Sequence, residues 1–244
     1  QNKRRETLIE NKDKALISKK LVTLKKDVPV KENETHQIVF NCNKGEITNL
    51  SDFADIYSDD IEIIGVDRPN FDQIQVLANE FIETKEDLKI QWVQATDDED
   101  STRNILPTSM NPNLGSMISD QIRESSEMLG ELVGCNEVGV RLATLRSPMC
   151  PLFHIDQIPC RLLITLCGEG TEWISNQDVD WDSFFDTSNK NVPIKHNGEI
   201  NKIKAGQWAL LKGAIWNNKY QGLVHRSPHE EKPRLLLSLD PIFN

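Results

Sequence analysis

Long apolar runs, positive charge and paired cysteines are all scarce in this 244-residue chain. No apolar run approaches the roughly 20 residues that a membrane-spanning helix requires, and no secretory signal is visible, so we expect no membrane partner. The formal net charge of −10 disfavours nucleic acid as a partner, because binding phosphates requires a basic face. Since 38% of the residues are hydrophobic and 27% are charged, the chain has the composition of a folded protein with a core.

The cysteines are few, and their spacing excludes two common uses. An odd number without a Cys-x-x-Cys pair argues against a disulfide framework and against a four-cysteine zinc site. Free thiols are the simplest interpretation, and because free thiols persist in a reducing compartment, we predict a cytoplasmic protein. The five positions are Cys42, Cys135, Cys150, Cys160 and Cys167.

Positive charge is concentrated at the beginning of the sequence. Residues 1–35 contain ten Lys or Arg against six Asp or Glu and have no aromatic residue, which predicts a charged arm, either partly helical or mobile. We predict that residues 36–244 form a single domain. Within it, residues 36–134 are expected to give helical and β support, and residues 135–244 the β core.

Hydrophobic periodicity predicts helices first and strands later. Apolar residues recur at helical spacing in residues 70–85 and 114–134, and the second segment is the stronger helix prediction. Downstream the sequence changes to short apolar runs separated by turns, such as those at 137–145 and 233–240. Closely spaced strands of this kind favour an antiparallel barrel or sandwich. The predicted fold class is therefore α+β, with helices packed outside a β core.

One histidine stands near a carboxylate at the start of an apolar strand. Residues i and i+2 of an extended strand share a face, so His154 and Asp156 present an imidazole and a carboxylate to one point. His225 ends another short apolar run later in the chain. Two imidazoles and one carboxylate on the rim of a β barrel form the facial triad of non-haem Fe(II) sites, which leaves coordination positions open. A competing pair, His229 and Glu231, lies in a polar, proline-bounded turn and is expected to face solvent.

An arginine begins the last apolar strand. If Arg234 points inward, its buried charge requires an anionic partner, and a guanidinium can hold a carboxylate by two parallel hydrogen bonds. The organic acid that would satisfy both this arginine and the open positions of an iron is 2-oxoglutarate. Arg161 could also reach the cavity and contact an anion, and Thr165 shares its face. A salt bridge at a strand edge is the alternative for Arg161.

The sequence resembles two known groups of proteins. His154-x-Asp156, followed by "AGQWALLKG", "GLVHRSP" and "RLLLSLD", is similar to the double-stranded β-helix, a cupin-like jelly roll, of the Fe(II)/2-oxoglutarate-dependent oxygenases. The stretches "CPLFHIDQIPCRLLITLCGEGTEW" and "GLVHRSP" resemble a largely bacterial family catalogued as domain of unknown function 1826. This second resemblance covers residues 36–244 and is densest after residue 140.

The resemblance implies a fold and a metal site. Its metal ligands, which are also the predicted catalytic residues, would be His154, Asp156 and His225. The carboxylate of 2-oxoglutarate would pair with Arg234. Arg226 is a second candidate for cosubstrate binding, although a regular strand would point it away from the metal.

A cysteine ligand would change the expected metal. Cys150 shares a face with His154 and Asp156 if the strand is regular, and a thiolate would favour zinc, because zinc prefers soft sulfur ligands. Pro151 interrupts the strand between them.

The sequence therefore predicts a non-haem Fe(II)/2-oxoglutarate-dependent dioxygenase of the hydroxylase type. One alternative is a metal-binding or metal-handling cupin-like protein that holds zinc without oxygenase turnover, and another is a structural barrel with a degenerate site. The sequence does not identify the substrate, a small molecule or a peptide, and a homodimer is one expected assembly because cupin-like barrels often pair. The segment 174–199 would border the entrance. Its candidates for substrate contact are Asp180, Trp181, Asp182 and Phe185.

Overall fold

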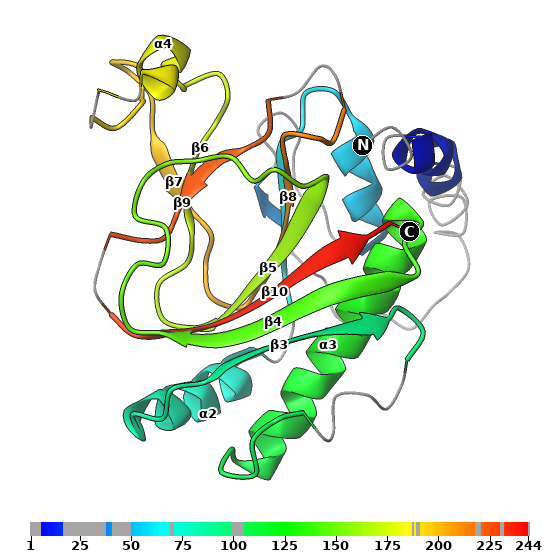
Figure 1. Cartoon of the computed structure of the whole chain (residues 1–244), viewed down its shortest axis with the longest axis vertical. Helices are drawn as coiled ribbons and strands as arrows, with labels where there is room; N and C mark the ends of the chain where they lie inside the picture. Colours follow the sequence, from blue (N-terminus) through cyan, green and yellow to red (C-terminus); the bar gives the residue numbers. More distant parts are fainter. Residues whose placement is uncertain are drawn as a thin grey trace.

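The computed structural model (Figure 1) describes residues 6–16, 38–40, 50–68, 71–98, 105–186, 188, 191–217, 221–229 and 232–243. A large curved antiparallel sheet lies at its centre, with helices α2 and α3 on one side and a small sheet on the other. Part of the predicted charged arm is described: residues 6–16 are helical, and Leu8 and Ala15 are buried in the core. Among the described helices, none combines the length and the apolar composition needed to cross a bilayer.

The two long helices form where apolar spacing predicts them. α3 (Pro112–Val133) begins after Asn111, whose side chain accepts a hydrogen bond from the Asn113 amide, and it has a proline in its first turn. It ends at Gly134, whose φ of 69° lies in the left-handed region that glycine tolerates. α2 (Phe71–Glu83) packs beside it. The buried residues of both helices join one hydrophobic core on the outer face of the large sheet.

The strands form two antiparallel sheets. The large sheet has the order β1-β2-β8-β5-β10-β4-β3, and the small sheet has the order β7-β6-β9. The large-sheet strands are β1 (Ile38–Phe40), β2 (Ile63–Asp67), β3 (Lys89–Ala95), β4 (Glu137–Leu145), β5 (Cys160–Cys167), β8 (Gln207–Lys212) and β10 (Arg234–Ile242). The small-sheet strands are β6 (Glu172–Ile174), β7 (Ile200–Lys202) and β9 (Val224–Arg226). The 3-10 helix η2 (Leu50–Tyr57) precedes β2, and α4 (Trp181–Phe185) lies between β6 and β7.

From β4 onward the chain passes back and forth between the two sheets in jelly-roll order. An isolated bridge between His154 and His225 adds the segment between β4 and β5 to the small sheet, beside β9. The result is two facing layers of four, β8-β5-β10-β4 and β7-β6-β9 followed by the bridge segment. This connectivity is a double-stranded β-helix, so the predicted α+β fold with outer helices is confirmed.

The two layers enclose a small apolar core. Leu163 and Leu236 of the large sheet and Trp173 of the small sheet are buried in it. Side chains alternate along a strand, so Arg161, two residues before Leu163, points to the same inner side. Arg234 does so as well, because it pairs in register with a β4 residue that packs against this core. The fold therefore directs two arginines into the space between the layers.

Gly168 brings the end of β5 against the start of β10. Its φ is +85°, and a Cβ placed there would lie 2.6 Å from the Pro233 carbonyl oxygen and 2.6 Å from Arg234 Cβ. We expect Gly168→Ala to lower the free energy of unfolding by about 2 kcal/mol or more, because left-handed backbone and steric overlap are both unfavourable. Thermal denaturation should then show a Tm lower by about 4–8 °C. Gly115→Ala is the control, since a Cβ there meets only Leu106 at 3.7 Å inside a helix; equal Tm values for wild type and Gly168→Ala would contradict this account.

Candidate metal centre

Two neighbouring segments hold the predicted ligand side chains. The His154 amide donates to the His225 carbonyl at 2.9 Å, and the His225 amide donates to the His154 carbonyl at 3.0 Å. This reciprocal pairing sets the two histidines side by side, and Asp156 follows two residues later. Phe153 and Ile155, which alternate with the polar residues, pack against an apolar cluster outside the small sheet. The alternation of the strand therefore buries one face and leaves the other for the site.

The three side chains converge on one another. A nitrogen of each histidine and a carboxylate oxygen of Asp156 all lie within 4.8 Å. His154 Nε2 is 3.7 Å from Asp156 Oδ1, and His225 Nε2 is 3.4 Å from Asp156 Oδ2. The centroids of the two imidazole rings are 4.5 Å apart. The structure thus brings together the residues that the sequence predicts as metal ligands.

Backbone carbonyls orient both imidazoles. His154 Nδ1 is 3.0 Å from the Leu152 carbonyl oxygen, and His225 Nδ1 is 3.0 Å from the Leu223 carbonyl oxygen. A carbonyl oxygen accepts only, so each Nδ1 carries the proton and each neutral ring keeps its lone pair on Nε2. Both Nε2 atoms face Asp156. Histidines that ligate metals are held in this way, so the donor set fits a divalent metal ion.

The electrostatics favour the metal-binding forms of these groups. Burial alone would raise the pKa of Asp156, but the neighbouring His225 and the charge of Arg161 outweigh it and lower this pKa to about 2. Burial, followed by the neighbouring His225, lowers the pKa of His154. At neutral pH Asp156 is therefore a carboxylate and His154 a neutral imidazole, the states that metal binding requires.

Arg161 contacts the cluster itself. Its Nη1 donates to Asp156 Oδ2 at 2.7 Å, and its Nε and Nη2 donate to the two oxygens of Asp240, each at 2.7 Å. The sequence suggests Arg161 as a candidate cosubstrate ligand, but each of its three nitrogens already contacts one of these two carboxylates. Arg161 therefore makes the salt bridges of the alternative interpretation.

Thr165 and Arg226 lie in different surroundings. Thr165 is buried on the inner side of β5, between the positions of Arg161 and Arg234 along the sheet. Arg226 of β9 and its cross-strand partner Glu172 of β6 lie on one face of the small sheet, opposite the face of His225. The Arg226 Nε donates to Glu172 at 2.8 Å, and its guanidinium lies 4.3 Å from the Phe153 ring centroid. The structure therefore does not bring Arg226 to the ligand cluster, because successive strand residues point to opposite sides.

Arg234 is a buried cation at the start of β10. It is 4% exposed, and burial lowers its pKa to about 10. Its guanidinium donates to Ser227 Oγ at 3.2 Å and to the Glu169 carbonyl at 3.5 Å. Of the residues that the structure describes, no carboxylate lies within ion-pair distance of it. A buried guanidinium without a counter-ion is unfavourable, so this position suits an anionic ligand. Ser227 follows His225 by two residues, which places this cation near the ligand cluster.

The cysteines do not join the ligand group. Among the described residues, that group contains only the two histidines and the aspartate. Cys150 is exposed, and its amide donates to Ser227 Oγ at 3.1 Å. The thiols of Cys135, Cys160 and Cys167 are buried, and burial raises their pKa values. Cys42 lies outside the described residues. In the described part of the chain, therefore, nothing supports a zinc site with a cysteine thiolate ligand.

The segment predicted to border the entrance contributes an aromatic group. Asp180 caps α4 by accepting a hydrogen bond from the Ser183 amide at 3.1 Å. Trp181 and Phe184 pack against the apolar cluster outside the small sheet, with their ring centroids 5.6 Å apart. Phe185 is exposed. α4 thus lies against the side of the small sheet away from the ligand cluster, as its place beside β6 and β7 in Figure 1 indicates.

Two contact residues were missed in the sequence analysis. Asp240, which binds Arg161, ends the apolar run of β10, and Ser227, which binds Arg234, follows β9. An acidic residue ending a buried strand is a weak signal by itself. Only the register of β5 against β10 places Asp240 beside Arg161. Of the competing pair, His229 is exposed and Glu231 lies outside the described residues.

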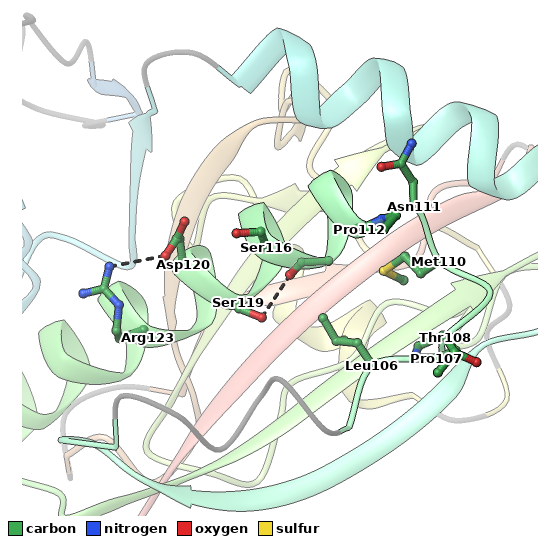
Figure 2. A pocket seen from close by; sticks show the side chains of 11 residues that line it. Leu106, Pro107, Thr108, Met110, Asn111, Pro112, Ser116, Ser119, Asp120 and Arg123 are labelled. Carbon is green, nitrogen blue, oxygen red and sulfur yellow. Dashed lines mark hydrogen bonds and ion pairs between the residues drawn. The ribbon is translucent and has the colours of Figure 1, made fainter.

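A separate pocket of about 470 Å³ lies beside the N-terminal half of α3 (Figure 2). A loop containing Pro107 and Met110 forms one wall, and Ser116 on the helix lines another part. Its arginine, Arg123, is paired with Asp120 at 3.5 Å. The pocket shares no residue with the ligand cluster, and its paired charges single out no ligand.

The jelly roll and its convergent side chains define a class: a double-stranded β-helix protein with a candidate two-histidine, one-carboxylate metal site. The chain belongs to the family described as "Protein of unknown function (DUF1826)", whose model matches residues 48–240. The family suggested by the sequence is therefore confirmed. Comparison with curated proteins gives no significant match.

Several solved structures resemble this chain at low identity. A Pseudomonas putida prolyl-4-hydroxylase is 10% identical with a TM-score of 0.44, over 80% of this chain and 94% of that one. A rice dioxygenase for auxin oxidation is 12% identical with a TM-score of 0.42, over 70% of this chain and 63% of the rice enzyme. Neurospora crassa T7H in complex with alpha-KG is 13% identical with a TM-score of 0.41, over 73% of each chain. Likenesses this distant do not identify a substrate.

Proposed function

We propose that this protein is a non-haem Fe(II)/2-oxoglutarate-dependent oxygenase of the hydroxylase type. The observation that carries the proposal is the combination of a pre-oriented His-Asp-His group with a buried, uncompensated arginine nearby. The triad supports a metal with open coordination positions, and the arginine supports an anion bound beside it. A ligand that chelates the metal at one end and carries a carboxylate at the other fits both.

Each residue has a distinct task in this proposal. His154, Asp156 and His225 hold the ion through two Nε2 atoms and a carboxylate oxygen, while the carbonyls of Leu152 and Leu223 fix the rings. When bound, Fe(II) and 2-oxoglutarate supply the activation of dioxygen for insertion of oxygen into a C–H bond. The protein binds and orients the reactants and limits access of water.

Arg234 binds the far carboxylate of 2-oxoglutarate. Its buried guanidinium offers donors in a fork that matches a carboxylate, and Ser227 Oγ already fixes one of its nitrogens at 3.2 Å. Thr165, buried on the same inner side, is a further hydrogen-bonding candidate for this ligand. Trp173, which pairs with His225 across the small sheet and is 2% exposed, closes the interior against water.

The substrate is a small molecule or a peptide that reaches the ligand cluster at His154, whose side chain is 34% exposed. A cytoplasmic location and a homodimer stay predictions from the sequence.

Anaerobic titration of Fe(II)-loaded protein with 2-oxoglutarate tests this function. We expect a weak visible charge-transfer band that saturates at one equivalent, because the cosubstrate chelates the ion through its keto acid end. Succinate as titrant is the control, since it lacks the keto group and gives no band. If metal binds but the band is missing, the oxygenase proposal fails and the metal-handling alternative, with iron or zinc, takes its place.

A further inference from the structure

Arg161 and Asp240 form a bidentate ion pair, and Arg161 also contacts Asp156. Arg161 Nε and Nη2 contact the two oxygens of Asp240 at 2.7 Å each. Its third nitrogen, Nη1, reaches Asp156 Oδ2 at 2.7 Å. Bidentate pairs of this kind are geometrically specific, because both planar groups must lie in register. One guanidinium therefore joins a residue of the last strand to a candidate metal ligand.

The register of the large sheet makes this arrangement rigid. Leu162 of β5 pairs with Leu239 of β10, so Arg161 and Asp240 are neighbours on two adjacent central strands. Their side chains are largely covered, at 22% and 31% exposure. Asp156, by contrast, lies on a segment joined to the small sheet by the single bridge at His154. The ion pair thus anchors a side chain of an irregular segment to the most regular part of the fold.

The hydrogen bond from Arg161 makes the two carboxylate oxygens of Asp156 inequivalent. Oδ2 accepts from Arg161 and lies 3.4 Å from His225 Nε2, while Oδ1 faces His154 Nε2 at 3.7 Å. Oδ1 accepts no hydrogen bond from the described residues. A carboxylate held at one oxygen keeps a fixed plane and presents the other oxygen to a metal ion in a single orientation.

The charges of the pair also matter. Asp240 neutralises Arg161, so together they orient Asp156 without adding net positive charge beside the ion. An arginine without its partner would repel a divalent cation, and an aspartate without its arginine would leave a second carboxylate close to the site. The pair therefore acts as one unit.

We propose that Arg161 and Asp240 are positioning residues that hold Asp156 as a one-oxygen metal ligand. This inference deepens the proposed function, on whose metal site it rests. It also replaces the role of cosubstrate ligand that the sequence suggests for Arg161. Neither residue contacts the reacting atoms; both act through Asp156.

Anaerobic titration with Co(II), monitored by its visible absorption, tests the pair. We expect Arg161→Met and Asp240→Asn each to weaken Co(II) binding by about 10- to 100-fold, the usual effect of losing an outer partner of a metal ligand. The double variant should bind no worse than the weaker single variant, because the two residues act as one unit. Arg161→Lys keeps the charge but not the fork, so its loss should be smaller. The band shape should also change in Arg161→Met, since the carboxylate is released.

A surface pair supplies the control. Arg146 contacts Asp87 at 3.0 Å and makes its other hydrogen bonds to the Ile82 and Glu86 carbonyls, not to the cluster. Arg146→Met and Asp87→Asn should therefore leave Co(II) affinity within about 3-fold of wild type. The Tm of each metal-free variant separates positioning from a purely structural role. A lower Tm with unchanged affinity and unchanged bands in Arg161→Met and Asp240→Asn would overturn the inference. If wild-type protein itself binds no Co(II), the metal site fails and the inference falls with it.

Discussion

His154→Ala is expected to weaken Fe(II) binding by more than about 100-fold and to abolish any 2-oxoglutarate turnover. Loss of an outer partner alone costs about 10- to 100-fold in metal affinity, so loss of a ligand must cost more. His154 is the informative ligand to remove, because its side chain is 34% exposed and its truncation leaves little buried cavity. Asp156→Asn should give a similar loss with almost unchanged shape, since it removes the negative charge of the site.

Anaerobic equilibrium dialysis against Fe(II) measures this effect directly. His229→Ala is the matched control, because His229 is an exposed histidine near the same strands and should leave one equivalent of metal bound. The Tm of metal-free His154→Ala should stay close to wild type. Retention of stoichiometric, tight Fe(II) by both His154→Ala and Asp156→Asn would remove the metal site, and with it the proposed enzyme.

Arg234→Met is expected to weaken 2-oxoglutarate binding by about 100-fold or more while Fe(II) stays bound. Hydrogen bonds to charged groups contribute about 1.5–3 kcal/mol each, so losing a two-bond contact to a carboxylate gives a change of this size. The charge-transfer band measures the cosubstrate, and equilibrium dialysis measures the metal. The ligand-free variant should be at least as stable as wild type, because a buried guanidinium without a counter-ion is replaced by an apolar side chain.

Arg226→Met tests which of the two arginines near His225, Arg226 or Arg234, binds 2-oxoglutarate. Arg226 faces away from the cluster toward Glu172, so 2-oxoglutarate affinity should change by less than about 3-fold. If wild type and Arg234→Met bind 2-oxoglutarate equally well, a residue other than Arg234 binds its far carboxylate. A protein that binds metal but no 2-oxoglutarate in any of these forms would be a metal-holding β-helix.

Much of the fold could be predicted from local sequence patterns. The apolar spacing of α3 and the capping residue Asn111 are properties of neighbouring positions, so they can be read without a structure. The short apolar runs that form β4, β5 and β10 are equally local. The fourth member of the small layer was harder to predict, because the segment around His154 pairs with β9 through one bridge and lacks the length of a strand.

The sequence alone determined the two long helices, the β-rich part after residue 134 and the identity of the three candidate ligands, because period and residue type are encoded in adjacent positions. The tertiary structure decided the partners of the charged residues. Arg161 and Asp240 meet only because β5 and β10 pair in one register. The close approach of Gly168 to the backbone at Pro233 and Arg234 is likewise a contact between distant parts of the chain. Contacts between residues far apart in the chain depend on packing, and no local pattern specifies them.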